Sequence, residues 1–324
     1  MLRFRRLGPR IVTIAFVSAY LDNLGSMLQD TVTLAIVFIV GIVHADYHNI
    51  KKIVNFGDST SDIGNGAAVL TRDNGPVIPS DAYYKGRFSN GPTYIEHVAA
   101  SLNVNLTSFS VGGATTADDI LQGWLGGKFG EPLRSNGQPI KVPGQDTQIA
   151  FYLNQTEPLD KSRILYTMWI GGNDDSDNAL LKLGIAASTF ADAQYDQWVA
   201  LAEAGAKNIL TIVPPPKTKF AAAYGARMHW NAIEFKWRYW GVKLGLFEMP
   251  ALMAGIVIAP SSYGFKYAMS DYCCKGNCFS GLKGNASVCS NPSDFALWDI
   301  VGHPSAKTHE LIGKEVVKFI KFWF

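Results

Sequence analysis

Short, mostly apolar runs alternate along the chain with longer stretches whose apolar residues recur at helical spacing. Apolar runs of about four to eight residues that end at turn-forming residues are typical of buried strands. Five runs are predicted to be strands: 51–57, 108–111, 163–170, 208–213 and 254–259. Five stretches are predicted to be helices: 92–102, 145–154, 189–205, 228–244 and 305–322. The alternation predicts the α/β class, as a three-layer α/β/α sandwich with a central parallel sheet.

The aromatic-rich segment 229–247 has two interpretations. Its tryptophans and phenylalanines suggest a platform for sugar or lipid, but they also fit an amphipathic helix that buries its rings. Lysine and arginine stems among the rings fit a helix that lies partly at the surface. The burying helix is the prediction carried forward.

The first 45 residues are predicted to be a signal peptide or another N-terminal targeting region. A basic stretch at 1–10 precedes two apolar runs, 11–20 and 32–43, and the second run leads into a small-residue cleavage pattern at Val43-x-Ala45. Two tandem runs are unusual, and one explanation is that Met27 is the true start.

Neither apolar run reaches the roughly 20 residues that span a bilayer. An uncleaved N-terminal segment that anchors the protein to a membrane remains the alternative. With no linker or repeat visible after it, residues 46–324 are predicted to form a single domain.

Charge and composition narrow the class of protein. Of the 324 residues, 48% are hydrophobic and 17% are charged, which is enough for a buried core, and the net charge is +2. The first 45 residues hold four arginines and two aspartates, so the remainder carries equal numbers of basic and acidic side chains. That balance argues against nucleic acid as a partner.

All four cysteines lie in one Gly/Ser/Asn-rich stretch, at Cys273, Cys274, Cys278 and Cys289. An even, clustered set suggests two local disulfides and an exported protein. Three pairings are open, and the adjacent pair 273–274 is the least favourable sterically. Zinc is a weak alternative because no His completes a tetrahedral set.

Three sequons for N-glycosylation begin at Asn105, Asn154 and Asn285. Such triplets occur by chance, so each adds only modest weight to the prediction of a secreted glycoprotein.

Residues suited to chemistry follow the predicted strands, where the loops of a parallel sheet meet. Gly57-Asp58-Ser59 follows the first strand, and glycine pairs end two later strands at 112–113 and 171–172, the latter just before Asn173. Asp299 and His303 share a loop ahead of the last helix. Because serine is a poor nucleophile without a base and an orienting carboxylate, these segments together supply the parts of a serine hydrolase.

The four segments resemble, in order and character, the blocks of the GDSL lipase/esterase family in the SGNH hydrolase superfamily. The fatty-acyltransferase-like and plant-type branch is most similar, since it also has a segment like 86–92, Gly-Arg-Phe-Ser-Asn-Gly-Pro. The resemblance covers about 53–320. No Gly-x-Ser-x-Gly motif is present, which argues against an α/β-hydrolase.

The resemblance implies a role for each matching residue. Ser59 would be the nucleophile, His303 the general base and Asp299 the carboxylate that orients it. The N–H groups of Ser59 and Gly113 and the side chain of Asn173 would form the oxyanion hole. No cofactor and no metal are implied.

The chain departs from the family at two places. Thr60 stands where the name-giving motif has Leu, which is a matter of packing. Three residues, 300–302, separate Asp299 from His303 where the family usually has two. One extra residue could move the carboxylate by ~3 Å and break its hydrogen bond, unless Gly302 absorbs it as a bulge.

The sequence therefore predicts a secreted serine hydrolase that forms an acyl-enzyme and cleaves lipid acyl esters or acetylated carbohydrate. Two alternatives remain open: a catalytically impaired binding or effector protein, and an acyltransferase on the same scaffold. The expected partner is a small-molecule, lipid or carbohydrate ester, with transient contact to a membrane surface, and the expected state is a monomer.

Overall fold

The computed structural model describes residues 47–324, apart from 73–77, 126–133, 136–137, 277 and 279–285. These residues fall in one compact unit, Asp46–Phe324. The targeting region predicted for 1–45 lies outside the described residues. Within the described part of the chain, no helix is both long enough and apolar enough to cross a membrane.

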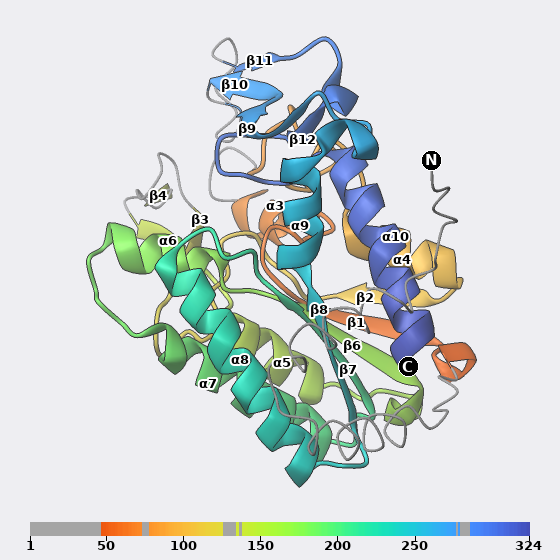
Figure 1. The fold of residues 1–324 in the computed structure, drawn as a ribbon. Helices are drawn as coiled ribbons and strands as arrows, with labels where there is room; N and C mark the ends of the chain where they lie inside the picture. Colours follow the sequence, from red (N-terminus) through yellow and green to blue (C-terminus); the bar gives the residue numbers. More distant parts are fainter. Residues whose placement is uncertain (1–46, 73–77, 126–133, 136–137, 277, 279–285) are drawn as a thin grey trace, which may run out of the picture. The chain divides into compact units, whose positions relative to one another are not determined.

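A parallel sheet of five strands forms the centre of the unit (Figure 1). In spatial order, the strands are β2 (Asn105–Ser108), β1 (Lys52–Gly57), β6 (Ile164–Trp169), β7 (Asn208–Val213) and β8 (Lys243–Glu248). Every pair of neighbours is parallel.

Helices cover both faces of this sheet. One face packs against α5 (Gln145–Leu153), α7 (Ala187–Glu203) and α8 (Lys219–Arg238), and the other against α4 (Tyr94–Leu102), α9 (Met249–Ile258) and α10 (Ala306–Trp323). The predicted three-layer α/β/α sandwich is confirmed.

Side chains of the central strand β6 show why helices pack on both faces of the sheet. Tyr166 and Met168 point into the core under α5, α7 and α8, whereas Leu165 and Trp169 point into the core under α4, α9 and α10. Successive residues of a strand face opposite sides, so a strand that is buried along its whole length needs a layer on each face.

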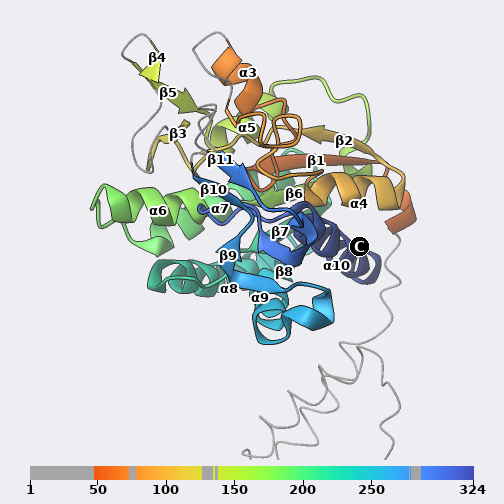
Figure 2. The same ribbon diagram turned by 90° about the horizontal axis from the view of Figure 1, so that it is seen from above.

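Smaller elements complete the fold. A three-stranded sheet beside α3 and a cysteine-containing region near the last helix are visible in Figure 2. These elements are α3 (Ala67–Arg72), β3 (Gly123–Leu125), β4 (Arg134–Ser135), β5 (Gln138–Val142), α6 (Gly172–Leu180), β9 (Tyr267–Tyr272), β10 (Cys274–Gly276), β11 (Ala286–Val288) and β12 (Phe295–Leu297). Short 3-10 helices lie at Tyr47–Asn49, Lys161–Arg163, Pro260–Tyr263 and Pro292–Asp294.

Two of the five predicted strands are wrong. The run 108–111 lies at the end of β2 and in the loop after it, because the strand itself is the polar edge segment 105–108. The run 254–259 belongs to α9 and its end, and the fifth strand is instead β8. Periodicity alone does not separate a short buried strand from a buried helix.

The predicted helix 228–244 is also displaced, since α8 ends at Arg238 and the chain then enters β8. Phe235 and Phe247 are buried as expected. The predicted burial of the tryptophans is wrong: Trp230, Trp237 and Trp240 are 66%, 84% and 90% exposed. The buried face of α8 is filled by smaller side chains and by Phe235, which leaves Trp230 and Trp237 on the outer face, and Trp240 lies beyond the end of the helix.

Candidate active site

The candidate site lies where the strand order reverses. From β1 the chain moves to β2 on one side, and it returns to β6 on the other side. Strands β1 and β6 end in register, with Gly57 opposite Trp169. A crevice forms at the carboxyl ends of such strands, so the loops that carry Ser59 and Asn173 are brought to one place.

The turn after β1 is fixed by a close backbone approach and a buried carboxyl group. A Cβ atom on Gly57 would lie 2.3 Å from the carbonyl oxygen of Trp169, so this position requires glycine. The carboxyl of Asp58 accepts hydrogen bonds from the N–H (2.9 Å) and the hydroxyl (2.7 Å) of Thr60. Burial raises the pKa of Asp58. Ser59 is therefore held between two anchored neighbours, with 8% of its surface exposed.

Asp62 joins this turn to the loop that carries Gly113. Its buried carboxyl accepts hydrogen bonds from the backbone N–H groups of Gly64 (2.8 Å), Ala67 (2.9 Å) and Gly112 (2.9 Å). Gly113 has a φ of +82°, and a Cβ there would lie 2.0 Å from the carbonyl oxygen of Trp124.

The start of α6 is fastened to the same loop. The side-chain amide of Asn173 donates to the carbonyl oxygen of Ala114 at 2.7 Å. Next to it, the buried Asp174 accepts from the N–H (2.9 Å) and the hydroxyl (3.1 Å) of Thr116. Because an amide has two N–H groups, this contact occupies only one of the donors on Asn173.

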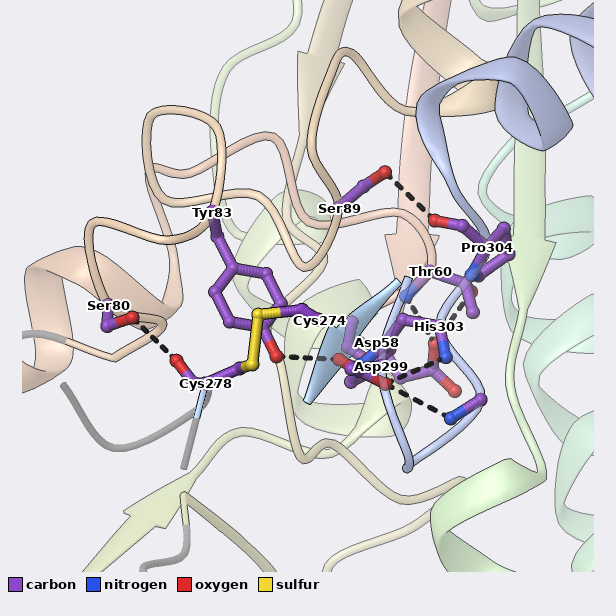
Figure 3. Close-up of polar contacts among 12 residues, drawn as sticks. Asp58, Thr60, Ser80, Tyr83, Ser89, Cys274, Cys278, Asp299, His303 and Pro304 are labelled. Carbon is purple, nitrogen blue, oxygen red and sulfur yellow. Dashed lines mark hydrogen bonds and ion pairs between the residues drawn. A yellow bond between two sulfur atoms is a disulfide. The ribbon is translucent and has the colours of Figure 1, made fainter. Parts of the chain in front are cut away.

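Ser59, His303 and Asp299 form one hydrogen-bonded chain, although Ser59 and His303 are 244 positions apart. His303 Nε2 lies 2.8 Å from Ser59 Oγ, and His303 Nδ1 lies 2.6 Å from Asp299 Oδ2. All three residues are buried. Figure 3 shows Asp299 and His303 beside the turn that carries Asp58 and Thr60.

The additional residue between Asp299 and His303 does not separate them. Gly302 adopts a φ of +98°, in the region that favours glycine. The backbone N–H groups of Gly302 (3.1 Å) and His303 (3.2 Å) both donate to Asp299 Oδ1. The loop thus turns back on its own carboxylate, which leaves Oδ2 for the imidazole.

One residue of the site has no signal in the sequence. The hydroxyl of Tyr83 donates to Asp299 Oδ2 at 2.7 Å. Tyr83 lies just before the segment 86–92, and no pattern distinguishes it from its neighbour Tyr84. Its role depends on a contact across 216 positions, which no local motif encodes.

His309 has a structural role in the fold. Its Nδ1 accepts a hydrogen bond from the backbone N–H of Tyr94 at 3.1 Å. Burial lowers the pKa of His309 to about 3. It is therefore neutral, and it joins α10 to α4 behind the site.

The cysteines form the disulfides Cys273–Cys289 and Cys274–Cys278. This pairing uses all four and leaves none for zinc. In the described part of the chain, no group of three or more His, Cys, Asp or Glu side chains is arranged to hold a metal ion.

Comparison with known proteins agrees with this arrangement. The chain matches the family described as GDSL-like Lipase/Acylhydrolase over residues 53–316, which is most of its length. It therefore belongs to that family, and the resemblance predicted from the four sequence blocks is confirmed.

Sequence identity to individual relatives is low. The chain is 25% identical to the thermolabile hemolysin of Vibrio parahaemolyticus over 83% of this chain and 63% of that protein. It is 28% identical to a phosphatidylcholine-sterol acyltransferase of Aeromonas hydrophila over 38% of this chain and 32% of that protein. It is 22% identical to a GDSL esterase/lipase of Arabidopsis thaliana over 84% of this chain and 88% of that protein. The chain thus spans less than two thirds of the first two relatives.

Solved structures with a similar chain path include TesA and a family two carbohydrate esterase from Clostridium thermocellum. TesA has 14% identity and a TM-score of 0.41, with 85% of this chain and 100% of that chain covered. The carbohydrate esterase has 14% identity and a TM-score of 0.44, with 85% and 65% covered.

Proposed function

We propose that this chain is a secreted serine hydrolase that cleaves carboxylic esters through Ser59, His303 and Asp299. The observation that carries the proposal is the hydrogen-bonded chain from Ser59 Oγ through the His303 ring to Asp299 Oδ2, with links of 2.8 and 2.6 Å. Membership of the GDSL-like Lipase/Acylhydrolase family supports the same reaction class.

In the acylation step, Ser59 Oγ attacks the ester carbonyl carbon while its proton moves to His303 Nε2. The carbonyl π electrons move onto oxygen and give a tetrahedral oxyanion. When the oxyanion collapses, the bond to the alcohol oxygen breaks, and that oxygen takes the proton from His303 Nε2. Asp299 holds Nδ1 protonated and stabilises the imidazolium that forms in between.

The oxyanion is proposed to be stabilised by the N–H groups of Ser59 and Gly113 and by the side chain of Asn173. The contact of Asn173 with Ala114 supports this assignment, because it places the amide beside the loop that carries Gly113. Losing one such donor typically costs about 3 kcal/mol of transition-state stabilisation.

In the second step, an oxygen nucleophile attacks the carbonyl carbon of the acyl-enzyme while its proton moves to His303 Nε2. When this tetrahedral intermediate collapses, the bond to Ser59 Oγ breaks, and Oγ takes the proton back from His303 Nε2. Water releases the free acid, whereas a competing alcohol would receive the acyl group instead. The partial match to an acyltransferase makes the second outcome the one to measure beside hydrolysis.

The proposed substrate is a lipid acyl ester or an acetylated carbohydrate. Exposed apolar side chains at Ile300 and Val301, on the loop that joins Asp299 to His303, support an apolar acyl group at the entrance. Two disulfides support the proposal that the protein is exported, because disulfides persist in oxidising compartments.

A serine variant tests the proposed chemistry. Ser59→Ala is expected to abolish hydrolysis of short p-nitrophenyl esters and labelling by a fluorophosphonate probe, because no other atom replaces Oγ. The matched control, Ser101→Ala, changes an exposed serine on α4 and is expected to keep both. Circular dichroism of both variants verifies that the fold is retained.

Undiminished hydrolysis by Ser59→Ala would overturn the proposal. A wild-type protein that is folded but neither hydrolyses esters nor reacts with the probe would favour the binding or effector alternative. Transfer of the acyl group to an added alcohol, detected by product analysis, would favour the acyltransferase.

A further inference from the structure

Among the described residues, the carboxylate of Asp299 accepts four hydrogen bonds, and one of them comes from outside its own loop. Oδ1 accepts from the N–H groups of Gly302 and His303, at 3.1 and 3.2 Å. Oδ2 accepts from His303 Nδ1 at 2.6 Å and from the hydroxyl of Tyr83 at 2.7 Å. A carboxylate has about four lone-pair sites, so these donors fix both its position and its rotation.

The hydroxyl of Tyr83 acts as a donor in this contact. Burial, together with the charge of Asp299, raises the pKa of Tyr83, so its hydroxyl keeps its proton. Burial alone would raise the pKa of Asp299 as well, but His303 and the hydrogen bonds from His303 and Tyr83 hold that pKa below its usual value. Tyr83 therefore helps to keep Asp299 ionised in a buried place.

The ring of Tyr83 is held on two sides. It packs edge-on against Trp298, with ring centroids 6.0 Å apart, and against Phe88, at 6.4 Å. Phe88 in turn packs against the ring of His303, at 5.2 Å. The tyrosine thus contacts both the residue before Asp299 and the aromatic side chain that borders the imidazole.

The segment 273–289, which carries both disulfides and is called the cystine region, is bonded to the segments that carry the two partners of the same contact. The hydroxyl of Ser80 donates to the carbonyl oxygen of Cys278 at 2.6 Å, which ties the loop bearing Tyr83 to the disulfide Cys274–Cys278 (Figure 3). The backbone N–H of Cys274 donates to the carbonyl oxygen of Trp298 at 2.7 Å. Both partners of the Tyr83–Asp299 hydrogen bond are therefore attached to one cross-linked segment.

We infer that Tyr83 is a positioning residue of the hydrolytic site, which acts by holding the Asp299 carboxylate in line with His303. The inference rests on the proposed function, because the Tyr83 hydroxyl is proposed to act on the reaction through Asp299. Its hydroxyl donates to the carboxylate that orients His303, so its removal should slow the chemical step and leave substrate binding unchanged.

The variant Tyr83→Phe removes the hydroxyl and keeps the ring. We expect kcat for a short p-nitrophenyl ester to fall about 10-fold, as for the loss of one hydrogen bond to a charged group, with KM within about twofold of the wild type. Tyr84→Phe is the matched control, since Tyr84 is the exposed neighbour on the same loop, and its kcat should not change.

A double-mutant cycle with Asp299→Ala separates positioning from general support of the fold. Without Asp299 there is no carboxylate to hold, so adding Tyr83→Phe to Asp299→Ala should lower kcat no further. Urea unfolding of all variants identifies conditions under which every variant is folded. The kcat values are compared under those conditions.

Each contrary result has its own meaning. The same 10-fold loss in the Asp299→Ala background would overturn the positioning role in favour of a structural one. An unchanged kcat in Tyr83→Phe, together with a large loss in Asp299→Ala, would overturn the role of Tyr83 alone. Wild-type activity in Asp299→Ala would overturn the proposed function and the role of Tyr83 together.

Discussion

Gly302 determines how Asp299 and His303 meet. The loop has one residue more than the family usually has, and the positive φ of Gly302 turns the chain so that its N–H reaches Asp299 Oδ1. A residue with a Cβ atom is disfavoured in this region of φ by roughly 1–2 kcal/mol. The geometry of the site thus depends on a backbone conformation at a residue that has no side chain.

Gly302→Ala is accordingly expected to destabilise the protein by about 1 kcal/mol and to lower kcat about 10-fold, because a small shift of the carboxylate misaligns the imidazole. The control is Gly184→Ala, at a φ of +67° in a place where a new Cβ meets nothing within 4 Å. It should lose similar stability and keep its kcat. Urea unfolding and ester hydrolysis measure the two effects, and equal kcat values in both variants would contradict the role given to Gly302.

At the scale of single residues, the sequence identifies candidate site residues that follow predicted strands or precede the last helix. Ser59, Asn173 and His303 come from blocks whose order and spacing are visible in the chain, and the structure brings Ser59 and His303 into contact. Tyr83 could not be predicted in the same way. Its partner Asp299 is brought near by the packing of Trp298 and the cystine region, which depends on the complete fold.

The helix α6 combines a candidate oxyanion donor with a buried acid. Asn173 and Asp174 stand in its first turn, and both are bonded to the loop after β2. Burial raises the pKa of Asp174 to about 7, and the nearby Asp58 adds to that rise. The helix start is thus attached through a carboxyl that takes up a proton on folding whenever the pH lies between its ordinary pKa and about 7.

Stability should therefore fall as the pH rises through this range. At pH 5 an unfolded chain has an ionised Asp174, whereas the folded protein keeps it protonated, so the folded state binds the additional proton. At pH 8 folding must bury the anion. Asp174→Asn keeps an acceptor for Thr116 and cannot ionise, so the wild type should lose stability relative to this variant between pH 5 and pH 8. Urea unfolding at both pH values measures the difference, and an equal gap at both would contradict it.

Whole elements could be predicted where a periodic pattern extended over many residues or where a strand lay in the middle of the sheet. The segments 208–213 and 145–154 match β7 and α5 closely, because buried parallel strands and amphipathic helices leave clear patterns. The prediction failed at 254–259. This apolar run belongs to α9, a helix that has Pro250 in its first turn. It also failed for the edge strand β2, because three of its four residues are polar and their sequence has no strand pattern.

At the scale of the molecule, two cross-links lie in the region that carries Asp299. Cys273–Cys289 closes a loop of 16 positions and Cys274–Cys278 one of four. The backbone N–H groups of Cys273 and Cys274 donate to the carbonyl oxygens of Leu297 and Trp298, just before Asp299. Among the described residues between Tyr267 and Leu297, the elements are the short strands β9 to β12 and one 3-10 helix. The disulfides therefore add covalent constraints to a small buried cluster that includes Tyr83, Phe295 and Trp298.

Removing each disulfide separately should reveal this constraint. In the chain-entropy description, the longer loop contributes about 3 kcal/mol and the shorter about 2 kcal/mol, so Cys273→Ser/Cys289→Ser should be the less stable of the two double variants. The Cys274→Ser/Cys278→Ser variant should show the lower kcat where both are folded, because it loosens the segment that accepts from Ser80. Under non-reducing conditions, urea unfolding measures which variant is less stable, and ester hydrolysis measures which has the lower kcat. If Cys273→Ser/Cys289→Ser is both the less stable and the less active variant, the cross-links act on stability alone, which would contradict the path from the cystine region to Tyr83 and Asp299.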